Sequence, residues 1–225
     1  MTEVRTFAWI RPESRSFIDA ARTEDARGVD AERAAAALRS DFERWSRWAF
    51  GILGFVLAIG GVFVAVGMIE TVRMLGGRPA PLDLAVIAIS AVIGLGGGAL
   101  LAALWWSGRR LLSAATWWLR RPYTAGGQQR RAGGWLQARA VNFEPRVFAR
   151  ILTAALALLI AVGAIALAIR DLNGQVTAMT AASAAVGAIA LAAGVGQIGG
   201  VMRLVSGIAE SDPLWVRIRS ALIGR

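Results

Sequence analysis

Few side chains in this sequence could carry out chemistry, and two reactive types are missing altogether. The 225 residues contain no cysteine and no histidine. This excludes disulfides, thiolate or imidazole metal sites, haem held by histidine, and Cys–His or Ser–His catalysis. No Walker loop, zinc-protease motif or nucleophile elbow is present either. We therefore expect neither a metal site nor a bound cofactor.

Three carboxylates near the expected cytoplasmic edge of the apolar stretches are the only candidates for acid–base catalysis. They are Asp41, Glu43 and Glu144, and each has arginines nearby in the sequence. An arginine neighbour can simply form an ion pair with a carboxylate. We therefore expect no catalytic residue and no enzymatic activity.

A second group of polar residues lies inside long apolar stretches. These residues are Ser90, Thr177, Thr180, Ser183 and Gln197. Serine and threonine hydroxyls commonly bond back to their own helix, so structural roles are expected first. In an oligomer, the same side chains could instead line a pore.

Four charge-free stretches must position these residues. They cover 48–69, 84–108, 151–169 and 172–202, and they are 22, 25, 19 and 31 residues long. About 20 apolar residues in a helix cross a hydrocarbon core of about 30 Å. With 56% apolar residues overall, the chain is predicted to be an all-α membrane protein with four transmembrane helices.

The arginines predict the orientation of these spans. Of the 25 basic residues, all arginine, 22 lie in the N-terminal segment, the central connection or the C-terminal tail. Cytoplasmic segments are enriched in such residues, and tryptophan prefers the headgroup layer. Eight of the nine tryptophans lie on or near the same side. We therefore expect both termini and the central connection to be cytoplasmic.

This topology divides the chain into five segments. They are a cytoplasmic helical segment (1–47), a first transmembrane hairpin (48–106), a basic loop (107–150), a second hairpin (151–202) and an amphipathic tail (203–225).

The second hairpin resembles the first in sequence. A shift of 103 residues in the first span places Arg47 on Arg150, and a shift of 93 in the second span places Gly94 on Gly187. Both hairpins would enter the membrane in the same direction, as in a parallel repeat. Internal duplication is our interpretation. Chance similarity between Ala- and Gly-rich segments is the alternative.

Small residues recur at steps of three and four, which places them on one face of each helix. Such faces let helix backbones approach closely in lipid. The expected packing residues in the first hairpin are Gly51, Gly54, Ala58, Gly61, Ala65, Gly94 and Gly98. Those in the second are Ala154, Ala157, Ala161, Ala164, Ala168, Ser183, Gly187, Ala190 and Gly194. Packing within the chain is the first interpretation, and contact between copies of the chain is the second.

Two N-terminal cytoplasmic helices are predicted. The first covers 13–27 and ends at Gly28. The second starts at Asp30 as N-cap and has an apolar face. No proline or glycine follows before Gly51, so we expect the second helix to continue into the first span.

Further amphipathic segments follow the second span. Leu111, Leu112, Ala115, Trp118 and Leu119 can share one helical face, in a segment expected to end at Pro122. It would extend the second span or lie on the membrane surface. Shorter amphipathic pieces are expected at 135–143 and 214–223, and Pro145 suits the first turn of the third span.

The central loop is rich in arginine. The candidate residues are Arg109, Arg110, Arg120, Arg121, Arg130 and Arg131. One interpretation is that they only orient the protein; the functional one is binding of anionic lipid headgroups or an acidic partner surface. No fold or motif for reading bases is visible, so no nucleic-acid partner is expected.

These features favour a non-catalytic membrane scaffold or accessory subunit that assembles with itself or with a larger membrane complex. The alternative is a small oligomeric channel, holin-like pore or uncoupled carrier. The middle of each span lacks an ionisable residue, which proton-coupled carriers usually need. The use of arginine without lysine suggests a GC-rich bacterial genome, and hence the bacterial cytoplasmic (inner) membrane.

Overall fold

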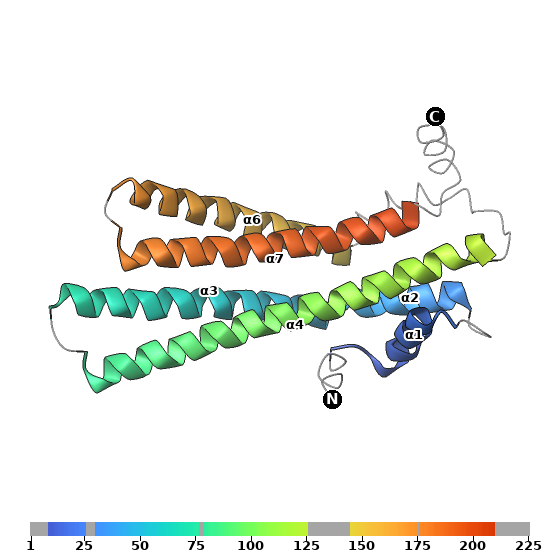
Figure 1. The fold of residues 1–225 in the computed structure, drawn as a ribbon, viewed down its shortest axis with the longest axis horizontal. Coiled ribbons are helices and arrows are strands. Elements are labelled where there is room, and N and C mark those ends of the chain that lie inside the picture. The colour runs from blue at the N-terminus through green and yellow to red at the C-terminus, as the bar shows by residue number, and fades with distance from the viewer. Residues whose placement is uncertain (1–8, 26–29, 77–78, 126–144, 175, 210–225) are drawn as a thin grey trace. The chain divides into compact units, whose positions relative to one another are not determined.

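The protein is helical throughout the part of the chain that the structure describes. The computed structural model describes residues 9–25, 30–76, 79–125, 145–174 and 176–209, with side chains up to 119 and 203 in the third and last ranges. The helices are α1 (Pro12–Thr23), α2 (Ala31–Phe42), α3 (Trp45–Met74), α4 (Pro81–Ala125), α6 (Pro145–Leu172) and α7 (Ala178–Ala209) (Figure 1). These ranges contain no strand.

Four helices are long and apolar enough to cross a membrane. Three of them contain a predicted stretch completely, whereas the fourth begins at Ala178, later than the predicted start at 172. Many of their large apolar side chains are exposed, among them Val56, Leu95 and Leu159. An exposed apolar surface of this extent is typical of lipid-facing helices. The prediction of an all-α, multi-pass membrane protein is confirmed at this level.

Contacts divide the chain into two compact units. Unit 1 comprises Met1–Arg47, Leu104–Ile151 and Ile198–Arg225; unit 2 comprises Trp48–Ala103 and Leu152–Gln197. Unit 2 contains most of the apolar helices.

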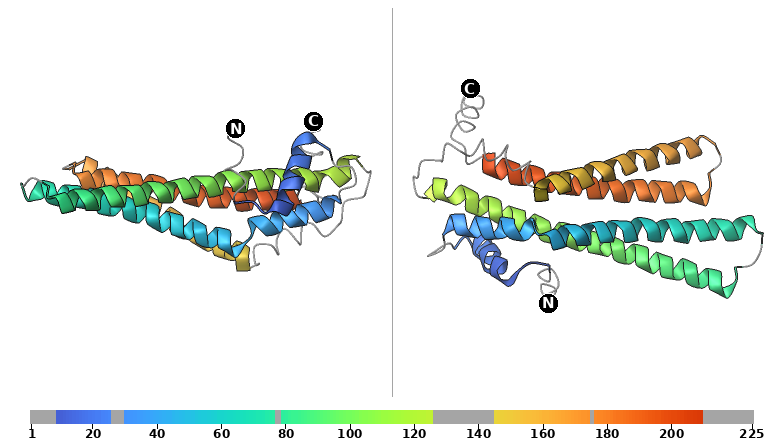
Figure 2. Two further views of the ribbon diagram at one scale, coloured as in Figure 1. Left: turned by 90° about the horizontal axis from the view of Figure 1, so that it is seen from below. Right: turned by 180° about the vertical axis from the view of Figure 1, so that it is seen from behind.

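In unit 2, α3 packs beside α4 and α6 packs beside α7 (Figures 1 and 2). The contacts are made by glycine and alanine, whose small side chains let two backbones meet. A Cβ atom added to Gly97 would lie 2.5 Å from the Ala58 nitrogen and 2.6 Å from the Gly54 carbonyl oxygen. The α3–α4 contact therefore has no room for a larger residue there.

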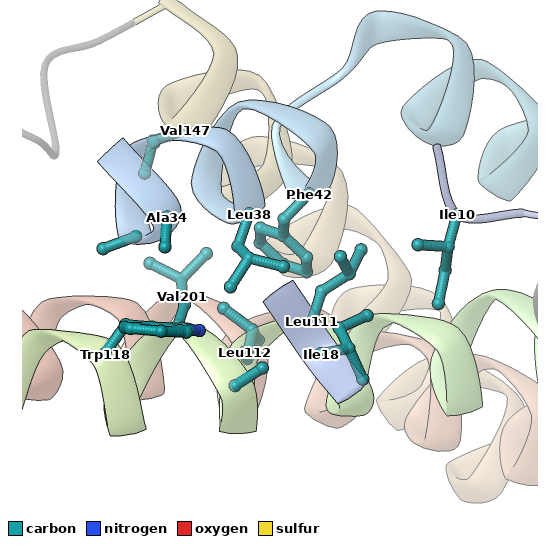
Figure 3. Packing of buried hydrophobic residues seen from close by; sticks show 13 residues of the cluster. Ile10, Ile18, Ala34, Leu38, Phe42, Leu111, Leu112, Trp118, Val147 and Val201 are labelled. Carbon is teal, nitrogen blue, oxygen red and sulfur yellow. The ribbon is translucent and has the colours of Figure 1, made fainter. Parts of the chain in front are cut away.

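Unit 1 has its own hydrophobic core. Leu38 and Phe42 of α2 pack against Leu111 and Leu112 of α4, and Trp118 is fully buried (Figure 3). The remaining members come from the N-terminal segment, α4, α6 and α7; they are Ile10, Ile18, Ala34, Ala35, Ala114, Ala115, Val147 and Val201. The predicted apolar face on α4 is thus confirmed, and protein covers it.

One hydrogen bond and one ring contact hold α1 against this core. The Trp118 indole N–H donates to the Phe17 carbonyl oxygen at 2.9 Å, and the two rings meet edge to face with centroids 6.4 Å apart. A buried indole N–H needs such a partner. The described part of the N-terminal segment therefore forms part of unit 1.

Three predicted helix limits are wrong. The first helix ends at Thr23, because Glu24 adopts a left-handed conformation with φ of 55°. The segment containing Leu111 extends the second span as part of α4, and α4 continues past Pro122 to Ala125. The Asp30 N-cap is confirmed by its bond to the Glu32 amide, and α6 begins at Pro145 as predicted.

The third error is the break between α2 and α3 at Glu43 and Arg44. In a continuous helix, the Phe42 carbonyl would accept a bond from the amide four residues ahead. Here it accepts a bond from the Arg150 guanidinium at 2.7 Å. A residue far along the chain therefore replaces the helical bond at this break.

Candidate functional site

The densest group of buried charged residues in unit 1 surrounds the break between α2 and α3. Asp41, Glu43 and Arg47 are each at most 6% exposed. Burying an ionised group is costly unless it is paired and hydrogen-bonded. The partners of each side chain therefore indicate what it does.

Arg47 connects three segments of unit 1. Its guanidinium donates to the Trp9 carbonyl oxygen at 2.9 Å, the Leu104 carbonyl oxygen at 3.0 Å and the Ser107 hydroxyl at 2.9 Å. The planar guanidinium can donate several bonds in fixed directions. Arg47 thereby ties the start of α3 to α4 and to the chain before α1.

Asp41 is fully buried and links α2 to the chain just before α1. Its Oδ2 accepts from the Arg11 amide at 2.9 Å, and its Oδ1 accepts from Arg44 at 3.2 Å. Glu43 pairs with Arg39 at 2.6 Å, one helical turn back. Both carboxylates are therefore engaged in bonds that hold the fold.

Arg150 stabilises the end of α2. Besides its bond to the Phe42 carbonyl, its guanidinium lies 4.7 Å from the centroid of the Phe42 ring. A cation at a helix C-terminus is favourable for the helix dipole. Arg47 and Arg150, which coincide in the sequence repeat, thus both donate to backbone carbonyls in unit 1.

The third candidate carboxylate, Glu144, lies outside the described residues. Among the described residues, no group of three or more Asp or Glu could hold a metal ion. Chemically, the arrangement around Arg47 is a set of tertiary links between helices.

Most small residues predicted for α3 and α4 lie at the contact between these helices. Gly54, Ala58, Gly61 and Ala65 are buried on α3. A Cβ atom on Gly61 would come within 2.5 Å of the Gly94 Cα atom and the Ser90 carbonyl oxygen. Two predicted members differ, because a Cβ atom on Gly51 or Gly98 would meet nothing within 4 Å.

Most small residues predicted for the second hairpin are buried on α6 and α7. Ala154, Ala157, Ala161, Ala168, Gly187, Ala190 and Gly194 are buried. A Cβ atom on Gly187 would lie 2.7 Å from Ile165 Cγ1, and one on Gly194 would lie 2.8 Å from Leu158 Cγ. Ala164 and Ser183 are only half-buried. Larger residues of α6 therefore pack onto glycines of α7.

Several polar residues of the apolar helices bond within unit 2. The Thr153 hydroxyl of α6 donates to Gln197 Oε1 of α7 at 3.0 Å. The Thr180 hydroxyl accepts from the Thr177 amide at 3.1 Å, at the start of α7. Ser90 is buried where α4 meets Gly61.

The predicted arginine group is only partly described. Arg109 is exposed and lies 4.8 Å from the Trp105 ring centroid, and Arg110 is half-buried. Arg120 and Arg121 belong to α4, but their side chains are outside the described set. Arg130 and Arg131 lie outside the described residues.

Sequence reasoning missed Gly97 as a packing residue and missed the links made by Arg47. Gly97 was overlooked in favour of Gly98, although a step of three from Gly94 also keeps a residue on one face. The signal for Arg47 was its position as the last arginine before a charge-free stretch. Its partners Trp9 and Ser107 are too distant in sequence for any local pattern to reveal them.

Comparisons with protein-family models, with curated proteins and with solved structures give no match for this chain.

Proposed function

We propose that this protein is a non-catalytic membrane scaffold or accessory subunit. Four spans would hold unit 1 at the cytoplasmic face of a bacterial inner membrane, where it would offer a helical platform to a partner subunit or to another copy of the chain. Both termini would be cytoplasmic, as the arginine distribution favours.

The observation that carries this proposal is how the buried charges of unit 1 are used. Arg47, Asp41 and Arg150 bond to the backbone of segments 30 to 108 residues away in sequence. Such bonds fix helices in place at several points. A platform that presents a constant surface to a partner needs this kind of internal linkage.

The packing of unit 2 supports two parallel hairpins derived by duplication. A Cβ atom on Gly94 would lie 3.3 Å from the Val62 nitrogen, and one on Gly187 would lie 3.3 Å from the Ile165 nitrogen. The shifts of 93 and 103 residues carry Gly94 to Gly187 and Val62 to Ile165. The sequence repeat thus also aligns one helix contact.

A pore is the alternative function, and the contacts of its candidate lining residues favour it less. Gln197 is engaged with Thr153, Thr180 receives a backbone bond, and Ser90 is buried in the α3–α4 contact. Polar groups used within a helix pair contribute less to a water-filled path.

Gentle purification at native expression level, followed by flux measurements in liposomes, tests the proposal. We expect a complex of fixed stoichiometry, with partner subunits or with itself, and no ion flux. Gln197→Leu and Ser183→Ala should then leave the flux at background level. Flux that changes in these variants, but not in the control Asn173→Ala at the exposed end of α6, would overturn the scaffold and favour the pore.

A further inference from the structure

The four long helices come together at one level of unit 1, near the end of α2. The Arg47 guanidinium of α3 donates to the Leu104 carbonyl oxygen of α4, and the Arg150 guanidinium of α6 donates to the Phe42 carbonyl oxygen. A Cβ atom on Gly200 of α7 would lie 3.2 Å from Phe42 Cζ. Residues of the four helices that adjoin these contacts therefore lie at the same level.

The charge-free stretches of all four helices end at this level. Arg47, Arg109, Arg150 and Arg203 are each the first charged residue outside one of these stretches. A charged side chain is costly inside the hydrocarbon core of a bilayer. The edge of the hydrocarbon core is therefore expected here on all four helices.

Exposed aromatic and arginine side chains gather at the same level. We call them the belt; they are Trp105, Trp106 and Arg109 of α4, Arg146 and Phe148 of α6, and Arg203 of α7. Trp106 and Phe148 are each 56% exposed. Tryptophan prefers the headgroup layer, and an arginine guanidinium binds phosphate oxygens through paired hydrogen bonds. The belt therefore has the composition of a surface that contacts lipid headgroups.

The exposed charges of the belt are all positive. The helix segments that carry them contain no acidic residue; these segments are 104–112, 145–151 and 198–203. Asp41 and Glu43, at the end of α2, are buried and engaged by Arg44 and Arg39. The adjoining N-terminal segment adds one exposed residue of each sign, Arg11 and Glu13. The belt thus suits an anionic headgroup better than a zwitterionic one, whose ammonium would find no carboxylate on these segments.

Negative charge gathers instead near the start of α2. Among the described residues from 19 to 33, five carboxylates and two arginines are exposed; they are Asp19, Glu24, Asp25, Asp30, Glu32, Arg22 and Arg33. Asp30 caps α2, and the 12 residues of this helix place it about 18 Å from Phe42. Because the Debye length at physiological ionic strength is about 8 Å, the two ends of α2 respond to a charged surface separately. An anionic membrane surface therefore attracts the belt and repels the start of α2.

We propose that the belt lies in the headgroup layer of the cytoplasmic leaflet and binds anionic phospholipids there. Its arginines pair with lipid phosphates, and its tryptophan rings lie between the headgroups and the acyl chains. The start of α2, with its carboxylates, is directed away from the membrane into the cytoplasm. The inference rests on the membrane location and orientation in the proposed function, and it adds the class of lipid that surrounds unit 1.

Electron paramagnetic resonance of spin-labelled lipids tests the belt in the full chain, reconstituted into phosphatidylcholine liposomes. The motionally restricted fraction of the label measures the lipid held at the protein surface. We expect spin-labelled phosphatidylglycerol to be held more strongly than spin-labelled phosphatidylcholine with the same acyl chains. This preference should fall toward equality at a salt concentration of about 1 M, where the Debye length is only about 3 Å.

A pair of double variants assigns the preference to the belt. Arg109→Gln with Arg146→Gln removes two of the three belt charges, so most of the preference should be lost. Arg22→Gln with Arg33→Gln is the matched control, because it removes two exposed arginines near the start of α2. The control should keep the preference of the unmodified protein.

Equal retention of the two lipids by the unmodified protein would overturn the proposal and leave the belt to an acidic protein partner. A preference that survives in the belt variant, or that falls equally in both variants, would overturn it as well. The flux assay for the scaffold is independent, so a conducting protein that still prefers phosphatidylglycerol would contradict only the scaffold.

Discussion

At the residue scale, Arg47 can be buried because its guanidinium donates hydrogen bonds to backbone carbonyls of other segments. The backbone carbonyls of Trp9 and Leu104 both accept bonds from its guanidinium. An unpaired buried carbonyl would cost free energy comparable to a lost hydrogen bond. The buried guanidinium therefore needs these carbonyls as acceptors, and the carbonyls need the guanidinium as a donor.

Replacing Arg47 with methionine should destabilise the protein and release the N-terminal segment. Methionine keeps the apolar stem but donates no bond, so the half-buried Trp9 and the Leu104 backbone each lose this donor to their carbonyl oxygen. We expect a loss of about 1–3 kcal/mol in the free energy of unfolding. Limited proteolysis in detergent should then cut the segment containing α1 faster than in the unmodified protein.

Arg33→Met provides the control, since Arg33 is an exposed residue of α2. Surface changes of this kind are usually within about 0.5 kcal/mol. Equal proteolysis rates in the two variants would show that Arg47 does not secure the N-terminal segment.

At the scale of elements, the α3–α4 pair is defined by which glycines face the partner helix. Gly60 and Gly61 are adjacent, yet only Gly61 approaches α4. One step along a helix rotates a residue by about 100°, so the neighbour points elsewhere. This pair allows the same substitution to be compared inside and outside the contact.

Gly61→Ala should weaken the α3–α4 contact, whereas Gly60→Ala should not. At Gly61 the new methyl group meets the α4 backbone at Gly94 and Ser90, which can yield only if the helices separate. Overpacking of this kind costs about 1–3 kcal/mol. Alanine at Gly60 meets nothing within 4 Å, and it removes the conformational freedom of glycine.

Thermal unfolding in detergent measures both variants. We expect a lower midpoint for Gly61→Ala and an unchanged or higher one for Gly60→Ala. If both variants unfold at the temperature of the unmodified protein, the contact at Gly61 is not part of the stable fold.

At the scale of the whole molecule, the arginine distribution predicts a single orientation of four spans. Leu75 and Asn173 follow the first and third apolar stretches and are exposed, so they should lie outside the cell. Glu13, in the arginine-rich N-terminal segment and also exposed, should lie in the cytoplasm.

Cysteine labelling can test this orientation directly, because the native chain has no cysteine. A membrane-impermeant maleimide should label Leu75→Cys and Asn173→Cys in intact cells. Glu13→Cys should react only after lysis. The reverse pattern would mean that the positive-inside rule fails for this chain, and mixed labelling would mean dual orientation.

The sequence alone determined the four apolar helices and several of the small residues where they meet. Insertion in lipid depends on a continuous run of apolar residues, which is a local property. The positions of Gly54, Ala58, Gly61 and Ala65 follow from helical periodicity, which is also local. For the same reason the Asp30 cap and the start of α6 at Pro145 could be predicted.

Only the tertiary structure decided where α2 ends and which residues meet. The Arg150 guanidinium donates a hydrogen bond to the Phe42 carbonyl oxygen, 108 residues away in sequence. The Arg47 guanidinium donates one to the Ser107 hydroxyl, 60 residues away. The Arg150 bond lies at a helix break in a segment that has neither glycine nor proline. Two of the carboxylates that the sequence offered as candidate acids, Asp41 and Glu43, are also engaged, by Arg11, Arg44 and Arg39. A local pattern carries no information about a partner so distant in the chain, because that partner is brought close only by the packing of the other helices.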